Sequence, residues 1–302
     1  MPMYDQVTAN KRRSAVLIIV FVLFVALVCA AFTYLLQWGP IGIVLAFAIA
    51  GGSAFFSYWK SDSIALAMSR AQPATVEQYP RLHNVVEGLC IASGLPKPRL
   101  YVIVDPAPNA FATGRNQKHA AIAVTTGLLE KMNRIELEGV LAHELSHIKN
   151  DDILVSTLAV TMVGVVALLA DIGVRGLLFG GRNRNNDSGN ILGLALMALA
   201  LVLLVLSPII ARLMQFAVSR KRESLADISG VEMTRYPPGL ISALEKLQAD
   251  QTVVSSASRA TAHLWIESPL ARTPEEGKMS KLNRMFDTHP PLEERIAALQ
   301  EL

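Results

Sequence analysis

The sequence predicts an α+β membrane protein that is mostly helical, with four transmembrane helices and a small β-sheet in its water-exposed part. Three observations carry this prediction. Hydrophobic residues make up 52% of the 302 residues and charged residues only 18%, and the mean hydropathy is +0.37. Four apolar segments are long enough to cross a bilayer. Two short runs of β-branched or alternating apolar residues lie among helical patterns.

The charge and the cysteines exclude some classes of protein. A formal net charge of +3 is small and widely spread, and no basic stretch alternates with aromatic residues, so a nucleic-acid partner is not expected. Cys29 lies in an apolar run and Cys90 in an amphipathic pattern, so the two cysteines provide neither a disulfide framework nor a C-x-x-C site. A reducing compartment fits the water-exposed part best.

The first two apolar segments form a predicted transmembrane hairpin. The segment from Ala15 to Leu36 carries no charge and follows three consecutive basic residues. Since a bilayer core needs about 20 helical residues, this segment can span it, and it is longer than the apolar core of a signal peptide. After a Gly-Pro turn, the segment from Ile41 to Trp59 is the second predicted span.

A second hairpin is predicted from Ile153 to Phe179 and from Ile191 to Ala211, with a Gly/Asn/Arg loop between the two spans. The third segment contains Asp171 and Arg175, and ionisable groups at membrane depth are costly. Three interpretations remain open for this segment: both groups snorkel to the interface, they form a buried ion pair, or the segment is partly re-entrant.

Basic residues near the spans predict the orientation, because cytoplasmic flanks carry the excess of Lys and Arg. Only Arg182 and Arg184 fall on one side. The other side, which we expect to be cytoplasmic, has Lys11, Arg12, Arg13, Lys60, Arg70, Lys149, Arg212, Arg220, Lys221 and Arg222.

The chain therefore divides into four predicted parts. Residues 1–59 are the first hairpin and residues 153–211 the second. Residues 60–152 and 212–302 are two cytoplasmic pieces that together form one domain.

Within the first cytoplasmic piece, the segment from Leu82 to Ser93 has the apolar spacing of an amphipathic helix. The segments from Arg99 to Val104 and from Ala120 to Thr125 are predicted strands. Asn109 to Gly114 lies between them and is either an edge strand that presents its backbone to an extended substrate or an ordinary loop with Phe111 packed inward.

The segment His143-Glu144-Leu145-Ser146-His147 has the H-E-x-x-H spacing of a zinc hydrolase. On an α-helix, residues four apart are offset by only about 40°, so both imidazoles can reach one metal ion while Glu144 is free to act as a base. Asn133 and Glu136 have the spacing of a capping box, which predicts that a helix begins there.

A third metal ligand is needed, because catalytic zinc is usually held by three protein ligands with water in the fourth position. Glu223 is the best candidate, since it follows the fourth span on the predicted catalytic side. Asp227 is four residues further along the expected helix and would accept a hydrogen bond from a ligand histidine. Taken alone, the pair also fits a solvated, salt-bridged helix face.

These residues resemble the HtpX-type membrane zinc metalloproteases, bacterial relatives of the CaaX prenyl proteases. The resemblance covers most of the chain: the first hairpin, Asn109 to Gly114, the H-E-x-x-H segment with Asp152 beyond it, the second hairpin, Glu223 to Asp227, and Thr288 to Arg295.

The resemblance implies a gluzincin-like protease domain in which His143, His147 and Glu223 bind one Zn²⁺ per chain and Glu144 is the catalytic glutamate. It also implies a multi-pass endopeptidase of the bacterial inner membrane, with its active site facing the cytoplasm, that degrades misfolded or damaged membrane proteins. Its expected partners are therefore polypeptide substrates and the lipid bilayer. The resemblance favours a place near the cleft for Asn109, with a role in substrate binding.

Several points stay open at this stage. The oxyanion of the reaction could be stabilised by His289, His263, Arg220 or Arg222, and the sequence does not choose among them. The alternative functions are a narrow-specificity processing protease of the CaaX type and an inactive, metal-bound scaffold. The sequence predicts neither a cleavage preference nor an oligomeric state.

Overall fold

The computed structural model describes residues 39–160, 220–250, 252–255, 261–267 and 290–302, together with isolated positions between residues 12 and 27. The fourth predicted span lies outside these residues, and so does most of the first and the third.

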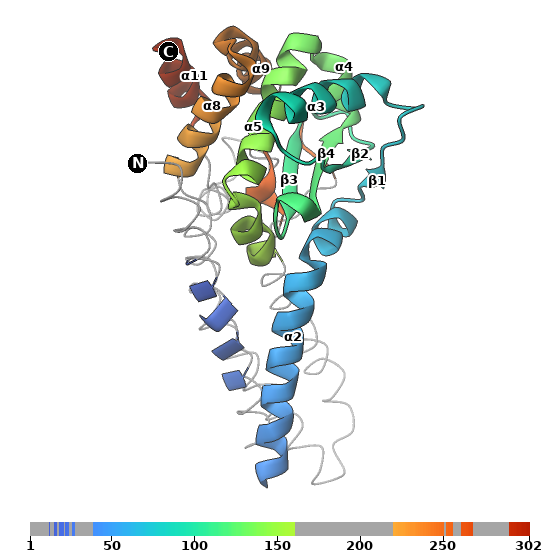
Figure 1. The fold of residues 1–302 in the computed structure, drawn as a ribbon, viewed down its shortest axis with the longest axis vertical. Helices are drawn as coiled ribbons and strands as arrows, with labels where there is room; N and C mark the ends of the chain where they lie inside the picture. Colours follow the sequence, from blue (N-terminus) through green and yellow to red (C-terminus); the bar gives the residue numbers. More distant parts are fainter. Residues whose placement is uncertain are drawn as a thin grey trace, which may run out of the picture.

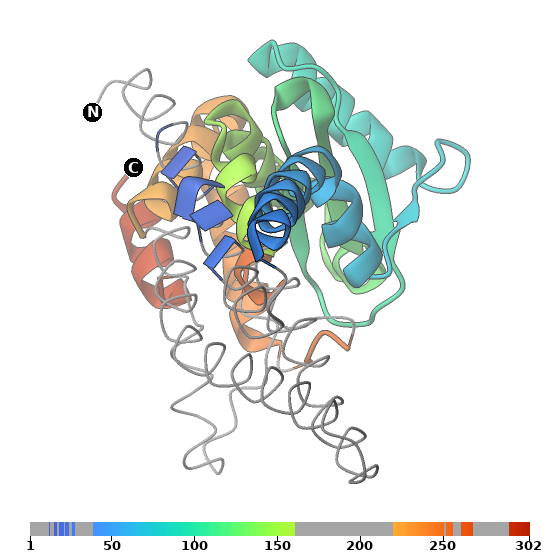
Figure 2. The ribbon, with the colours of Figure 1, turned by 90° about the horizontal axis from the view of Figure 1, so that it is seen from below.

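The second predicted span lies within α2 (Gly39–Met68), which extends from the part of the molecule that contains the sheet (Figure 1). Viewed from below, α2 is seen nearly end-on beside β3 and β4, both of which it contacts (Figure 2). Phe55, Phe56 and Trp59 are exposed on its surface. Among the described residues, no helix is both long enough and apolar enough to cross a membrane.

A four-stranded mixed sheet forms one side of the domain, with the order β1-β2-β4-β3. Its strands are β1 (Gln72–Pro73), β2 (Arg99–Ile103), β3 (Ala110–Gly114) and β4 (Ala120–Thr125). β2 and β4 are parallel, whereas the other two pairs are antiparallel. The two predicted strands are confirmed, and the segment between them is an edge strand in which Phe111 is fully buried.

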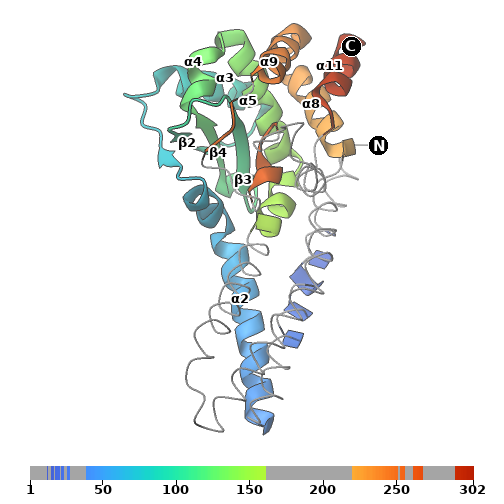
Figure 3. The ribbon, with the colours of Figure 1, turned by 180° about the vertical axis from the view of Figure 1, so that it is seen from behind.

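Helices make up the rest of the described fold (Figures 1 and 3). The predicted amphipathic helix is confirmed, and it ends at Gly94, which has the left-handed conformation that favours glycine. The helices with complete bounds are α3 (Pro80–Ser93), α4 (Thr126–Lys131), α5 (Arg134–Lys149), α8 (Arg220–Thr234), α9 (Pro237–Ala249) and α11 (Leu292–Gln300), with short 3₁₀ helices η1 (Gln117–His119) and η2 (Ala262–Leu264). Residues 152–160 are helical as well.

α5 lies at the centre of the core, between the sheet and the pair α8 and α9 (Figure 3). Its apolar residues Leu137, Leu141 and Leu145 are completely buried. α8 approaches α5 closely at Gly230, where a Cβ atom would lie 3.0 Å from the backbone nitrogen of His143. This close approach brings the side chains of the two helices to a common centre.

Glu136 fixes the start of α5 and joins it to α9. Its Oε2 accepts hydrogen bonds from the backbone N–H of Asn133 at 2.8 Å and from Lys246 Nζ at 2.7 Å, and its Oε1 accepts one from Ser242 at 2.7 Å. The reciprocal bond from Glu136 N–H to the Asn133 side chain completes the predicted capping box.

Candidate metal centre

α5 carries His143 and His147 on one face, as their spacing predicts. The two Nε2 atoms are 3.2 Å apart, and the rings are nearly perpendicular. His143 is completely buried, while the His147 side chain keeps 16% of its surface exposed. Both histidines therefore direct the same ring nitrogen at one point.

Glu223 reaches this point from α8. Its Oε2 lies 3.6 Å from His143 Nε2, and its Oε1 lies 3.6 Å from His147 Nε2. Ligand atoms of the three residues all lie within 4.8 Å of one another, so they can hold a metal ion together. Two imidazoles and one carboxylate leave an open coordination position, which is the arrangement of catalytic rather than structural zinc sites.

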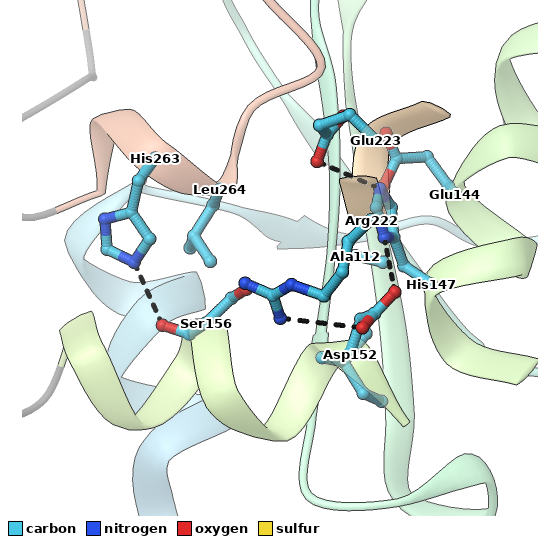
Figure 4. A pocket seen from close by; sticks show the side chains of 10 residues that line it. Ala112, Glu144, His147, Asp152, Ser156, Arg222, Glu223, His263 and Leu264 are labelled. Carbon is cyan, nitrogen blue, oxygen red and sulfur yellow. Dashed lines mark hydrogen bonds and ion pairs between the residues drawn. The ribbon is translucent and has the colours of Figure 1, made fainter. Parts of the chain in front are cut away.

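Glu144 lies beside this group and lines the same cavity as His147 and Glu223 (Figure 4). Its side chain is almost fully buried, and burial raises the pKa of its carboxyl above the usual value. A raised pKa brings a carboxyl closer to neutral pH, where it can both accept and return a proton.

A buried Asp–Arg pair supports His143 from behind. Asp227 Oδ1 lies 2.8 Å from His143 Nδ1, while Arg295 donates to Asp227 Oδ2 at 2.9 Å and to Oδ1 at 2.7 Å. Burial opposes ionisation of Asp227, but the charge of Arg295 and the bond to His143 outweigh it, so the pKa of Asp227 is lowered. Burial is the largest single influence on the pKa of His143 and would lower it, but the hydrogen bond and charge of Asp227, together with Glu223, outweigh burial and raise this pKa to about 9.

A second carboxylate lies behind the other histidine. Asp152 Oδ2 is 3.3 Å from His147 Nδ1, and Asp152 Oδ1 is 3.5 Å from Arg222 Nη1. Figure 4 shows Asp152 between the imidazole and the guanidinium. Each histidine thus has its own carboxylate, and each carboxylate has its own arginine, an arrangement that fixes the tautomer and orientation of both rings.

Sequence reasoning gave no role to Arg295 or Asp152, although both belong to segments that carry the family resemblance. Neither residue stands at a diagnostic spacing from H-E-x-x-H. A search for a carboxylate just beyond His147 could have suggested Asp152, whereas no local signal connects Arg295 with Asp227.

The oxyanion candidates fall in different places. Arg222 and His263 both line the cavity that contains Glu144, and His263 Nε2 lies 3.0 Å from the carbonyl oxygen of Ser156. Arg220 begins α8, and its side chain is not described. His289 lies outside the described residues.

Asn109, the predicted substrate-binding residue, lies directly before the edge strand β3 and is buried. Its Nδ2 donates to the carbonyl oxygen of Glu267 at 3.1 Å, and its Oδ1 accepts from the N–H of Ala110 at 3.0 Å. Its side chain thus bonds to the chain's own backbone.

The cavity encloses about 370 Å³, including open solvent at its mouth. Its lining combines polar and charged side chains with the apolar residues Ala112, Ile153 and Leu264.

The chain is similar to known peptidases. The profile of Peptidase family M48 matches residues 76–302. A protein described as "Protease HtpX homolog" from Dictyoglomus thermophilum is 44% identical over 98% of this chain and 94% of its own length. Proteins with the same description from Caldanaerobacter subterraneus and Streptococcus uberis are each 41% identical over 99% of this chain, covering 98% and 100% of their own lengths. The crystal structure of Ste24p from S. mikatae matches 88% of this chain and 67% of its own, at 19% identity and a TM-score of 0.43.

Proposed function

The chain belongs to peptidase family M48 and is a metalloprotease, and from this premise we propose that it is a membrane-embedded zinc endopeptidase that cleaves misfolded or damaged proteins in protein quality control. One observation carries the proposal: the ligand atoms of His143, His147 and Glu223 converge to within 4.8 Å, with the buried carboxyl of Glu144 beside them. The description of the relatives as HtpX homologues supports the quality-control role.

The donor set supports zinc. Two imidazoles and one carboxylate are the ligands of many zinc peptidases, although the Irving–Williams order allows other divalent ions to bind such a set. When bound, zinc lowers the pKa of a water molecule to near 7 and polarises the carbonyl of the peptide bond.

The protein's own residues supply the proton transfers and the orientation. Glu144 accepts the proton of the attacking water and then delivers it to the departing amine, a contribution of about 10²- to 10⁴-fold for such proton transfer. Asp227 and Asp152 hold the ring tautomers of His143 and His147. Arg222 and His263 line the cavity and remain candidates for stabilising the oxyanion, as does His289.

Substrate binding is proposed at the edge strand β3. Ala112 lines the same cavity as Glu144, so an extended polypeptide that pairs with this strand passes the catalytic carboxyl. Backbone pairing gives affinity without reading side chains, which suits a protease of unfolded proteins. We keep Asn109 as a substrate-binding candidate because it lies at the start of the same strand.

The membrane topology is also a proposal. α5 precedes residues 153–211 and α8 follows them, yet the two helices meet at one centre. The two proposed spans between them are an even number of crossings, so they would return the chain to the same side of the membrane. Together with the apolar segments and the basic flanks, this supports four spans and a cytoplasmic site at the bacterial inner membrane.

The test compares wild-type protein, Glu144→Gln and Glu138→Gln, all purified in detergent. Glu138 lies on the same helix and serves as a matched control for the loss of one carboxylate. We expect one zinc ion per chain in all three proteins and casein hydrolysis by the wild type and Glu138→Gln only. Full activity of Glu144→Gln would refute the assigned base. Failure of the wild type to cleave unmodified casein would favour CaaX-type processing of lipidated substrates or, if lipidated peptides also stay intact, the scaffold.

A further inference from the structure

Along β3, the backbone N–H and C=O groups of successive residues point alternately toward β4 and toward the open edge of the sheet. Thr125 N–H donates to Asn109 O at 3.0 Å, so Asn109 and Thr125 form a hydrogen-bonded pair of the antiparallel ladder with β4. Because such pairs alternate with pairs whose polar groups point away from the partner strand, Ala110, Ala112 and Gly114 direct their backbone groups toward the open edge of the sheet.

Three of these six outward groups are already bonded within the chain, at the two ends of the strand. The carbonyl oxygen of Ala110 accepts from Ile266 N–H at 2.9 Å, and the N–H of Ala110 donates to the side chain of Asn109. At the other end of the strand, Gly114 N–H donates to Thr157 Oγ1 at 3.1 Å. In the described part of the chain, Ala112 alone in β3 has an outward N–H and an outward C=O that both lack a partner.

The segment that covers Ala110 is residues 261–267, which we call the strap. It is held to the domain at several points. Trp265 is fully buried, and its ring packs edge-on against Phe111 with 4.9 Å between centroids. Ile266 is 2% exposed, and its carbonyl oxygen accepts from Arg295 at 3.0 Å. A segment with this much buried surface is part of the core and not a loop that opens easily.

We propose that the strap permanently closes one end of the edge strand, so that a substrate pairs through its backbone with Ala112 alone. This inference rests on the proposed function and deepens it. The strap at the Ala110 end and Thr157 at the Gly114 end thereby fix the register of the substrate at a single residue and exclude an extended ladder along β3. Two strap residues, His263 and Leu264, also line the catalytic cavity, so the same segment forms one of its walls.

A single paired residue has a consequence for recognition. Edge-strand binding usually gains affinity from several alternating hydrogen bonds along the strand. With Ala112 alone, the backbone contributes at most two such bonds, and they lie at the cavity that Glu144 also lines. The substrate is therefore positioned at the cleaved bond but is held weakly, which allows many unrelated sequences to be accepted.

The test is a backbone scan of one peptide substrate. A twelve-residue peptide that the full-length enzyme cuts at one site is chosen from a casein digest. Each amide nitrogen except that of the cleaved bond is then methylated in turn, which removes one N–H without changing the side chains. We expect kcat/KM to fall about three- to tenfold or more at one position only, since a net hydrogen bond contributes about that much.

Two sensitive positions separated by two residues would overturn the inference, because they would show that the substrate also pairs with Ala110 or Gly114. An even response at every position would overturn it as well. If no unmodified peptide is cut, the proposed function itself fails, and this result is distinguishable from a failed scan.

A variant of the strap gives a second measurement. Trp265→Ala removes the ring that packs on Phe111 and should release the outward carbonyl of Ala110, so that a second sensitive position appears two residues from the first. Leu244→Ala, at another completely buried position on α9, is the matched control for a loss of core packing and should keep one sensitive position. If the Trp265→Ala variant is folded and still shows a single position, the strap does not set the register.

Discussion

Replacement of Arg295 by Met should weaken both the fold and the metal site. The buried Arg295 side chain donates two hydrogen bonds to Asp227 and one to the carbonyl oxygen of Ile266. Its Nη2 also lies 3.4 Å from His143 Nδ1. Met fills a similar volume without charge. The substitution therefore leaves the Asp227 carboxylate buried beside His143 without its cation.

The structure sets the expected size of the effect. Removing one partner of a buried ion pair costs about 3–5 kcal/mol, because the other charge stays desolvated and unpaired. Such a loss is a large fraction of a typical folding free energy of about 5–15 kcal/mol. Loss of a group that orients a ligand histidine lowers metal affinity by about 10- to 100-fold.

The assay separates these two effects. The free energy of unfolding is measured in detergent after chelation of metal, and zinc affinity is measured by competition with a chromophoric chelator. Arg134→Met makes the same chemical change at an exposed position of α5 and should alter neither quantity. The double variant Arg295→Met/Asp227→Asn should be more stable than Arg295→Met alone, because the amide oxygen still accepts from His143 and no charge is left unpaired.

The reasoning would be refuted if Arg295→Met matched the wild type in both measurements. It would also be refuted if the double variant lost the sum of the two single losses, since the residues would then act independently.

Three further predictions follow from the same contacts. Asp152→Asn should lower zinc affinity by about 10-fold or more in the chelator assay, because Asp152 orients His147 without binding the metal. Casein should still be cleaved at saturating zinc. Complete loss of metal would instead show that Asp152 is a ligand. Gly230→Ala should destabilise the fold by about 1–3 kcal/mol in the unfolding assay, because its Cβ would press on the backbone of His143, and an unchanged stability would show that α8 can shift at no cost. Burial opposes the ionisation of Glu136, but hydrogen bonds with Lys246, Asn133 and Ser242 stabilise its anion, so the pKa of Glu136 is lowered from 4.5. Its contribution to stability is therefore present above pH 4.5 and is lost as the pH falls below that value. Unfolding titrations should therefore show wild type more stable than Glu136→Gln at pH 7, with the difference shrinking below about pH 4.5, and a difference independent of pH would contradict this account.

Local patterns were enough to predict several elements of the fold. The capping box of Asn133 and Glu136 and the β-branched run from Ala120 to Thr125 act within a few residues, so the helix and strand they predict are present in the structure. The convergence of Glu223 on the H-E-x-x-H helix was also predictable, because helical spacing and the expected topology limited the choice of a third ligand.

Other features depend on contacts between distant segments and left no local pattern to follow. Arg295 lies 68 residues beyond Asp227, and only the packing of α11 against α8 and α9 brings the two together. The strap has no regular hydrophobic period, so its pairing with Ala110 could not be predicted from the sequence. α2 continues to Met68, beyond the apolar span that ends at Trp59. Its last turns are stabilised by packing against the domain, which the hydropathy of the segment does not indicate.

The measurement that tests the central claim most directly is X-ray absorption spectroscopy of the zinc-loaded protein beside its Glu223→Ala variant. The account predicts two imidazole ligands at about 2.0–2.1 Å and only nitrogen and oxygen in the first shell, with one oxygen ligand replaced by water or lost in the variant. Fewer than two imidazoles, a sulfur ligand near about 2.3 Å, or a zinc affinity of the Glu223→Ala variant equal to that of the wild type would contradict the metal site.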